Sequence, residues 1–227
     1  MKKLVTAALA LVMGAISVTA FADEGNFFVN ADAGQANYRV GTLNNSNASV
    51  NVVSDGSHLD KQDAAGALRF GYRWHGVVDY GVETGYADLG QAASRSSAPY
   101  SNIADIKSRG WILGGNLKYN IHDSWYVSAR AGWFRAKLED KGVASIFPNC
   151  SALLVCPQYI GSLHYQDSST GTGEYLGLGA GYNFSTHFSL GLSYDNYHAR
   201  PNNSHSNFGI PDGVNVALYS VSAEYRF

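Results

Sequence analysis

The sequence predicts an all-β fold, an eight-stranded antiparallel up-and-down β-barrel that spans a membrane. Three observations lead to this prediction. Apolar and polar residues alternate in eight segments, which is the signature of strands whose two faces meet different surroundings. The connections between these segments are alternately short and long. Aromatic residues gather on the apolar face near the short connections, as they do in the girdles of membrane barrels.

The eight segments have the length needed to cross a bilayer as tilted strands. In chain order they cover residues 27–34, 67–74, 78–86, 111–119, 125–133, 176–182, 188–195 and 217–227. Their apolar faces carry, strand by strand, Phe27, Val29, Ala31 and Ala33; Leu68, Phe70, Tyr72 and Trp74; Val78, Tyr80, Val82, Thr84 and Tyr86; Trp111, Leu113, Gly115, Leu117 and Tyr119; Trp125, Val127, Ala129, Ala131 and Trp133; Leu176, Leu178, Ala180 and Tyr182; Phe188, Leu190, Leu192 and Tyr194; and Ala217, Tyr219, Val221, Ala223, Tyr225 and Phe227.

The opposite faces combine glycine and serine with charged residues. The charged candidates are Asp32, Arg69, Arg73, Asp79, Glu83, Lys118, Arg130, Glu224 and Arg226. An eight-stranded barrel has an interior only wide enough for side chains to fill it. Because an unpaired buried charge is costly, we expect these residues to form ion pairs inside the barrel.

The register of the second and third segments predicts two of these pairs. A short turn around residues 75–77 sets Arg73 opposite Asp79. The same register sets Arg69 opposite Glu83. We interpret the interior charges as a structural polar core, and an ion path is the less favoured alternative.

Connection lengths predict the orientation of the barrel. The short links lie around residues 75–77, 121–124 and 185–186, and the long polar links cover residues 35–65, 89–105, 138–173 and 199–213. In outer-membrane barrels the short turns and both termini face the periplasm, and the long loops face outward. The sequence therefore predicts four extracellular surface loops.

The N-terminus has the pattern of a secretory signal peptide. A basic pair at residues 2–3 precedes an apolar run over residues 4–18 and the small-residue pattern Ala20-Phe21-Ala22. The run is too short for a spanning helix, and acidic residues follow it in place of a basic flank. We expect cleavage after Ala22, export to the bacterial outer membrane, and one barrel domain over residues 23–227.

Cys150 and Cys156 lie in a predicted extracellular loop of an exported chain, where a disulfide can persist. We interpret them as a local disulfide that stabilises the loop by roughly 2 to 3 kcal/mol. A metal site is disfavoured because no histidine or carboxylate lies between the two cysteines.

The final segment places Ala223, Tyr225 and Phe227 on one face. This ending resembles the C-terminal signal that the outer-membrane insertion machinery recognises, by a strand-addition mode. A secreted soluble β-protein, such as a sandwich or a lipocalin-type barrel, is the alternative fold. Such a protein needs no terminal strand of this kind, so we favour the membrane barrel.

Several motifs together resemble the OmpA-like family of small outer-membrane barrels. They are Gly71-Tyr72-Arg73, the stretch over residues 80–86, residues 117–121, residues 129–132 and the terminal Tyr225-Arg226-Phe227. The resemblance implies an eight-stranded barrel that spans most of the mature chain.

In that family a lumenal glutamate on the third strand forms buried ion pairs, and Glu83 matches its position. The sequence departs from the family at Gly191 and Ser193, where the last inner charged pair would fall. The partner set is therefore expected to differ. The sequence also ends at the barrel, without the peptidoglycan-binding domain of longer members, so cell-wall anchoring is not implied.

Nothing in the sequence specifies a reaction. The net charge of −2 offers no footprint for nucleic acid, and the histidines lack metal-ligand spacing, so we expect no cofactor and no metal. A lipid A-modifying enzyme is the first alternative, through His198, the segment His205-Ser206-Asn207 and Asp212. Adjacent His and Ser point to opposite faces of a strand, which disfavours it.

We therefore predict a non-enzymatic barrel with roles in envelope integrity and surface interaction, and a small passive pore is the second alternative. The expected partners are outer-membrane lipids and lipopolysaccharide, the barrel-assembly machinery during insertion, and an extracellular ligand at the loops. Closure of the barrel leaves no free strand edge that demands a partner, so a monomer is expected.

Overall fold

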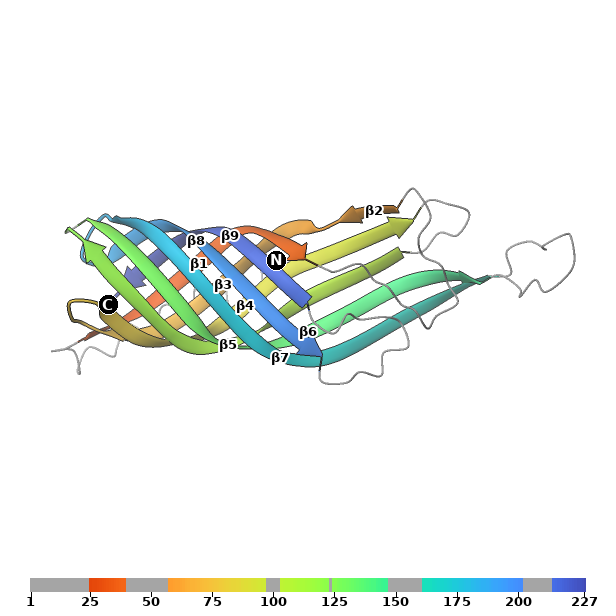
Figure 1. Cartoon of the computed structure of the whole chain (residues 1–227), viewed down its shortest axis with the longest axis horizontal. Helices are drawn as coiled ribbons and strands as arrows, with labels where there is room; N and C mark the ends of the chain where they lie inside the picture. The colour runs from red at the N-terminus through yellow and green to blue at the C-terminus, as the bar shows by residue number, and fades with distance from the viewer. Residues whose placement is uncertain (1–24, 40–56, 97–102, 123, 147–160, 202–213) are drawn as a thin grey trace, which may run out of the picture.

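One antiparallel sheet contains all the strands of the described residues, and it closes into a barrel (Figure 1). The structure is a computed structural model that describes residues 25–39, 57–96, 103–122, 124–146, 161–201 and 214–227. Its strands are β1 (Gly25–Arg39), β2 (Ser57–Asp60), β3 (Gln62–Trp74), β4 (Asp79–Ser96), β5 (Ile103–Ile121), β6 (Trp125–Ile146), β7 (Gly161–Asn183), β8 (Phe188–Pro201) and β9 (Val214–Arg226).

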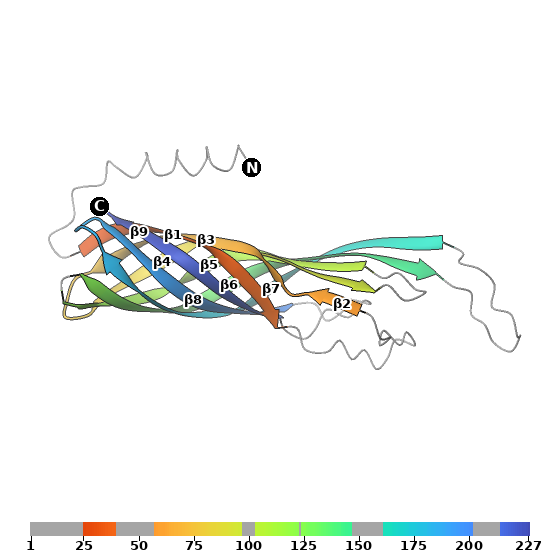
Figure 2. The same ribbon diagram turned by 90° about the horizontal axis from the view of Figure 1, so that it is seen from above.

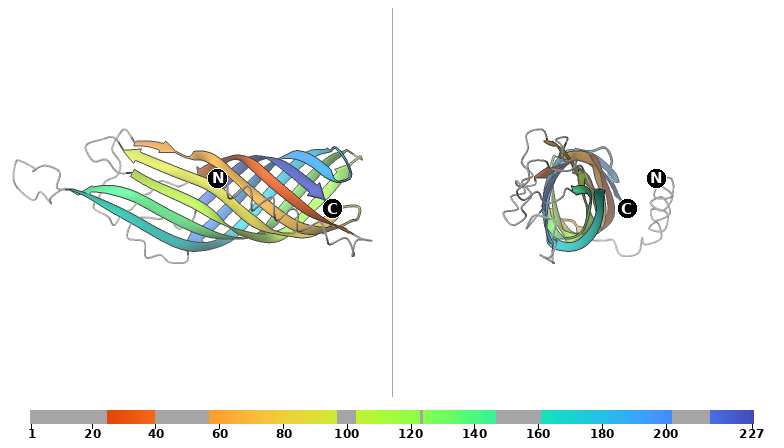
Figure 3. Two further views of the ribbon diagram at one scale, coloured as in Figure 1. Left: turned by 180° about the vertical axis from the view of Figure 1, so that it is seen from behind. Right: turned by 90° about the vertical axis from the view of Figure 1, so that its right-hand side faces the viewer.

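Around the barrel the strands follow their order in the chain, and β1 pairs with the last strand, β9. Neighbours run β2-β4-β3-β1-β9-β8-β7-β6-β5, and pairing of β4 with β5 completes the ring seen end-on in Figure 3. Only Lys61 separates β2 from β3, and both pair with β4, so in the described residues they act as one barrel strand. The eight-stranded antiparallel up-and-down barrel predicted from the sequence is confirmed.

The first and last strands lie side by side. β1 pairs with β9, and the backbone N–H of Phe227 donates to the carbonyl of Phe27 at 3.0 Å. The C-terminus therefore lies at the end of the barrel that carries the turns between β3 and β4, β5 and β6, and β7 and β8 (Figure 1). We call this the short-turn end, and the opposite end the far end.

An apolar band surrounds the outer wall next to the short-turn end. Trp125 and Trp133 mark its two borders on β6, and their side chains are 61% and 73% exposed. The eight steps between them cover about 27 Å of strand at about 3.4 Å per residue. At a tilt of about 40° this is about 21 Å of membrane thickness, close to the roughly 25 Å apolar band of outer-membrane barrels. No helix in the described part of the chain is long and apolar enough to cross a membrane.

The strands continue well beyond this band, so the predicted long loops are shorter than expected. β6 and β7 have 22 and 23 residues, against the 9 to 11 or so that a spanning strand requires. Their ladder runs from the pair Trp125 and Tyr182 to the pair Ile146 and Gly161, and the two strands project from the barrel in Figure 2. The prediction of a loop over residues 138–173 was therefore wrong at both ends.

The reason is a reversal of the apolar face where each strand leaves the band. On β6 the outward residues are apolar up to Trp133. Beyond it, Phe134 and Leu138 are buried inside the barrel, and Arg135 and Lys137 are exposed on the outside. The outer wall meets lipid in the band and water beyond it. Alternation persists, but its sense inverts, so a search for one continuous pattern stops at the boundary.

The predicted register of the hairpin between β3 and β4 was wrong by two residues. Trp74 pairs with Tyr80, so Arg69 lies opposite Gly85 and Arg73 lies opposite Gly81. The turn is longer than expected because it covers residues 75–78, and β4 begins at Asp79. The Asp79 carboxylate accepts a hydrogen bond from the backbone N–H of residue 76 at 3.2 Å.

Candidate functional site in the barrel interior

Charged side chains fill the half of the interior nearer the short-turn end. They form two groups, and every predicted interior charge except Asp79 belongs to one of them. The Glu224 cluster consists of Glu224, Arg73, Lys118 and Arg226. The Arg69 cluster consists of Arg69, Asp32, Asp195, Glu83 and Arg130.

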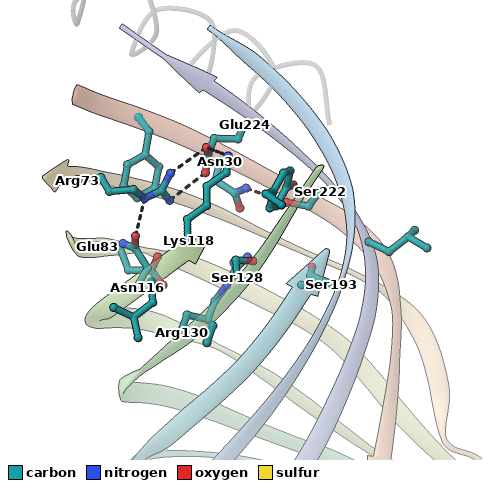
Figure 4. Close-up of a pocket in the computed structure, with 16 residues that line it drawn as sticks. Asn30, Arg73, Glu83, Asn116, Lys118, Ser128, Arg130, Ser193, Ser222 and Glu224 are labelled. Atoms are coloured by element: carbon teal, nitrogen blue, oxygen red, sulfur yellow. Dashed lines mark hydrogen bonds and ion pairs between the residues drawn. The ribbon is translucent and has the colours of Figure 1, made fainter. Parts of the chain in front are cut away.

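In the Glu224 cluster three cations from different strands share one carboxylate. Figure 4 shows two of them, Arg73 and Lys118, with Glu224. Arg73 donates to both carboxylate oxygens of Glu224, each at 3.0 Å. Lys118 Nζ donates to Oε1 at 2.9 Å, and Arg226 Nη1 lies 3.7 Å from the same oxygen. The forked contact of Arg73 is the strongest geometry available to a carboxylate. It ties β3 to β9 across the barrel.

Aromatic rings provide further support for the cations of the Glu224 cluster. The guanidinium carbon of Arg73 lies 4.3 Å from the ring centre of Phe28. Lys118 Nζ lies 4.0 Å from the ring centre of Tyr126. Such contacts attract the cation to the electron-rich ring face, most strongly where water is excluded. They help a cluster with more cations than carboxylates to remain charged.

In the Arg69 cluster, the guanidinium group of the fully buried Arg69 reaches three carboxylates. It donates to Asp32, lies 3.3 Å from Asp195 Oδ2 and lies 3.7 Å from Glu83 Oε1. Arg130 contacts two of the same acids, at 3.5 Å from Asp32 and 3.7 Å from Asp195. Two arginines thus face three carboxylates, so this cluster has the opposite charge balance to the Glu224 cluster.

Hydroxyl groups complete the Arg69 cluster. Tyr175 donates to Glu83 at 2.7 Å, and Tyr197 accepts a hydrogen bond from Arg69 at 2.7 Å. Ser193 donates to Asp32 at 3.2 Å. Buried charges are tolerated when hydrogen bonds use their remaining lone pairs and protons. The two tyrosines also form the boundary with the apolar part of the interior.

The predicted pairing of Arg73 with Asp79 is absent from the described residues. Arg73 turns to Glu224, and the Asp79 carboxylate instead accepts from Asn120 at 3.5 Å and lies 3.3 Å from His75 Nδ1. Asp79 is the first residue of β4, next to the turn, so its side chain lies at the short-turn end of the interior. Arg69 does contact Glu83, although the two residues are not directly opposite each other.

Apolar side chains fill the interior beyond the two charged clusters, toward the far end. This apolar layer consists of Ala36, Tyr38, Ala67, Ala87, Leu89, Ala92, Ile112, Phe134, Ala136, Leu138, Tyr175, Tyr197, Ala199, Val214, Val216 and Leu218. The rings of Phe134 and Tyr197 pack edge to face, with centres 5.1 Å apart. The interior therefore has two successive fillings, one ionic and one hydrophobic.

Little space remains between the charged clusters. A cavity of about 20 Å³ is lined in part by Asn116, Ser128 and Arg130 (Figure 4). A single water molecule requires roughly 10–15 Å³ of such space. The cavity thus has room for one water molecule and is too small for a hydrated solute.

Sequence reasoning missed three members of this interior. Asp195 is not among the predicted interior charges, although it is fully buried against Arg69. Tyr175 and Tyr197 were not singled out at all. The signal was available: both tyrosines stand at inward positions, beyond the point where apolar residues change face.

The predicted assembly residues lie on the outward face of the closing strand. Ala223 pairs with Ala31 of β1, and the rings of Tyr225 and Phe227 pack edge to face with centres 5.1 Å apart. Several other predictions fall outside the described residues. They are the signal peptide over residues 1–22, Cys150 and Cys156, the segment His205-Ser206-Asn207, and Asp212.

His198, the candidate of the enzyme alternative that the structure does describe, lies on the outer face of β8. Arg200 Nε donates to His198 Nε2 at 3.0 Å, and His198 Nδ1 lies 2.6 Å from the side-chain oxygen of Asn215. Arg200 and Asn215 thus occupy both ring nitrogens. Within the described ranges, neither ring nitrogen contacts a nucleophile or a carboxylate. Among the described residues, no group of three His, Cys, Asp or Glu side chains could hold a metal ion.

The solved structures that are similar to the chain include Ail of Yersinia pestis in complex with the heparin analogue sucrose octasulfate, OprG of Pseudomonas aeruginosa and the outer membrane protease OmpT of Escherichia coli. Their sequence identities to this chain are 16%, 12% and 9%, and their TM-scores are 0.48, 0.43 and 0.45. The alignments cover 90%, 90% and 89% of this chain and 99%, 96% and 97% of theirs.

No curated protein matches the chain. The family model described as "Outer membrane protein beta-barrel domain" matches residues 7–227, which is nearly the whole sequence. The closed barrel, its apolar outer band and this match lead to one conclusion: the chain belongs to the outer membrane protein beta-barrel domain family.

Proposed function

We propose that the protein is a closed barrel of the bacterial outer membrane, which supports the envelope and interacts with ligands through its extracellular end. The observation that carries the proposal is the double filling of the interior. An ion that entered from the short-turn end would first meet the Glu224 and Arg69 clusters, and then the apolar layer around Phe134 and Leu138. The two obstacles differ in kind, so no single rearrangement removes both.

The energetics of each filling favour a closed interior. Breaking a buried ion pair costs about 3 to 5 kcal/mol, because the remaining charge stays buried without its partner. Conduction requires sites that bind an ion weakly enough to release it. The apolar layer offers an ion no ligands of this kind. A barrel with these features acts through its surface.

Planar-bilayer recording tests the closed interior. We expect insertion of the folded protein to give no steady current above that of the protein-free bilayer. A conducting porin in the same lipid provides the positive control, and protease protection in vesicles provides the control for insertion. A steady, voltage-independent current carried by the inserted protein would overturn the proposal and favour the small passive pore.

Deletion of the gene tests the envelope role. We expect the deletion strain to admit more of a large hydrophobic antibiotic, and a copy that encodes the full chain to restore the barrier. Unchanged antibiotic entry would contradict this role.

The lipid A-modifying alternative predicts a changed acyl pattern in the same two strains. We expect mass spectrometry of their lipid A to give identical patterns.

A further inference from the structure

The outer wall of β4 to β8 carries a groove within the apolar band. Its volume is about 770 Å³, within the range of roughly 300 to 1,000 Å³ that is typical of ligand pockets. Outward residues with small or absent side chains form its floor, namely Gly115 of β5 with Ala129 and Ala131 of β6. Leu176 and Leu178 of β7 form one wall, and both are more than half exposed.

Packing of the barrel does not explain the glycine in this floor. At the inward Gly114, an added Cβ would lie 2.3 Å from the carbonyl of Ala131, so the narrow interior requires a glycine there. At the outward Gly115, an added Cβ would meet only the carbonyl of Gly81, at 3.4 Å. A larger side chain fits at Gly115 without strain, and it would fill the groove. The groove can therefore be altered while the barrel stays intact.

A cluster of cations lies directly beyond the groove, on the side of the far end. It consists of the outward residues Lys107, Arg109, Arg135 and Lys137, opposed by the carboxylates of Asp88 and Glu139. Glu139 Oε1 accepts a hydrogen bond from Arg109 and lies 3.0 Å from Lys137 Nζ. Glu139 therefore holds these two cations side by side. The strand register adds Arg135 to them, opposite Trp111.

The two features follow one another along a single outward row of β6. From the far end the row reads Lys137, Arg135, Trp133, Ala131 and Ala129. Cations stand where the wall meets the membrane surface, a tryptophan marks the border, and the groove lies below it. This order complements an amphiphile that has an anionic headgroup at the surface and an apolar tail in the membrane.

We propose that this wall binds a phosphorylated glycolipid with several acyl chains, of the lipid A class, in the outer leaflet. Arginine binds phosphate through paired, charge-assisted hydrogen bonds, and lysine supports it as a point charge. Phosphate groups carry the negative charge that complements these four cations. The breadth of the groove, from Tyr80 of β4 to Tyr194 of β8, fits neighbouring acyl chains of one headgroup better than a single chain.

The competing contacts within the cation cluster do not block this site. Ion pairs on a water-exposed surface contribute about 0 to 1 kcal/mol in general, so Glu139 and Asp88 hold the cations in place without neutralising all of them. Arg135 is an exposed residue of β6. It lies next to Trp133 on the outward row and opposite Trp111 of β5. A lipid phosphate at that height lies within reach of the neighbouring cations as well.

Native mass spectrometry of the full-length folded barrel in detergent tests the proposal. The probes are diphosphorylated lipid A, its dephosphorylated form and phosphatidylglycerol. We expect one tightly bound copy of diphosphorylated lipid A per barrel. The double variant Arg135→Gln with Lys137→Gln should weaken this binding about tenfold or more, which is the scale of losing one charge-assisted contact. Gly115→Leu should weaken it severalfold by filling the groove.

Two matched controls lie on the outer surface of β1, on the opposite side of the barrel from β6. Arg39→Gln removes an exposed outward charge, and Ala31→Leu enlarges an exposed outward residue of the band. Both should leave lipid A binding unchanged, and all variants should retain the electrophoretic shift of a folded barrel. Equal binding by the wild type and the wall variants would overturn the proposal. Equal binding of dephosphorylated lipid A or of phosphatidylglycerol would overturn it too.

The proposal rests on the outer-membrane placement of the proposed function, but not on the closed interior. A barrel that conducts ions could still bind the glycolipid at its outer wall, and a closed barrel could fail to bind it. Bilayer recording therefore tests the closed interior, and lipid binding tests the site on the outer wall, independently of one another.

Discussion

Glu224 is the residue on which the charges at the short-turn end depend. Arg73, Lys118 and Arg226 all approach its carboxylate within the barrel. Burial removes most of the water that could stabilise these cations, so their charge relies on this one acid and on aromatic contacts. The same residue bridges strands that are far apart in the sequence.

Replacement of Glu224 by Gln should lower the free energy of unfolding by about 3 to 5 kcal/mol, since it leaves buried cations without their counter-charge. Urea unfolding of the barrel in lipid vesicles measures this loss. Glu174→Gln is the matched control, because Glu174 is an exposed outward residue of β7. We expect the control to stay within about 0.5 kcal/mol of the wild type. Similar losses in both variants would contradict the central role of Glu224.

Arg69 contacts its acids at different distances, which predicts unequal coupling. It donates a hydrogen bond to Asp32, whereas its Nε lies 3.7 Å from Glu83 without a hydrogen bond. Double-mutant cycles with Arg69→Met should therefore give about 1 to 3 kcal/mol of coupling with Asp32→Asn and a smaller value with Glu83→Gln. Additive losses in the Asp32 cycle would show that the two residues do not interact.

Glu139 lies beyond the apolar band, and the hydrogen bonds from Lys137 and Arg109 lower its pKa from 4.5 to about 2. A carboxyl group with a lower pKa in the folded state stabilises the fold above its unfolded pKa. This contribution is lost as the pH falls from about 4.5 toward about 2. A carbon-13 NMR titration, assigned with Glu139→Gln, should give a midpoint about 2. Lys137→Met should raise that midpoint, and a wild-type midpoint near 4.5 would contradict the assignment.

At the scale of the strand, β6 performs two tasks in succession. Its first part presents an apolar face to lipid, and its second part presents Arg135 and Lys137 to water while Phe134 and Leu138 pack inside. The change occurs between neighbouring residues, at Trp133. A strand can make this change because its faces alternate at every residue, so a shift of one position exchanges them.

Cysteine labelling locates this boundary. In a background with Cys150 and Cys156 replaced by Ser, a membrane-impermeant maleimide should label Lys137→Cys on intact cells. Ala131→Cys should remain unlabelled because lipid covers it. Both variants should react after denaturation, which controls for reactivity. Labelling of Ala131→Cys at the rate of Lys137→Cys would place the boundary elsewhere.

At the scale of the whole molecule, closure determines stability. Pairing of β1 with β9 satisfies the backbone groups that an open sheet would expose to lipid, where each unpaired group is costly. The ladder must break in many places at once before the barrel opens. The folded state should therefore persist in detergent until it is heated.

Gel electrophoresis without boiling tests this property. The unboiled protein should migrate at a different position from the boiled protein, because the intact barrel binds less detergent and stays compact. The transition temperature should fall in Glu224→Gln and stay the same in Glu174→Gln. A single position at all temperatures, together with recovery in the soluble fraction, would contradict a membrane barrel.

The sequence by itself determined the number of spanning strands, their faces in the apolar band and most of the interior charges, with Asp195 as the exception. These properties depend on alternation at every second residue, which is local information that each segment carries alone. The positions of Trp74, Trp125 and Phe227 indicated the aromatic border at the short-turn end for the same reason.

Only the tertiary structure decided which charges meet. Arg73 and Glu224 are 151 residues apart, and the tilt and stagger of the closed sheet bring them together. The register of the hairpin between β3 and β4 differs by two residues from the predicted one. It therefore changes which residues lie opposite Arg69 and Arg73. The reversal of faces beyond Trp133 also required the structure, because it depends on where the membrane ends. That boundary belongs to the assembled barrel in its bilayer, and local alternation carries no record of it.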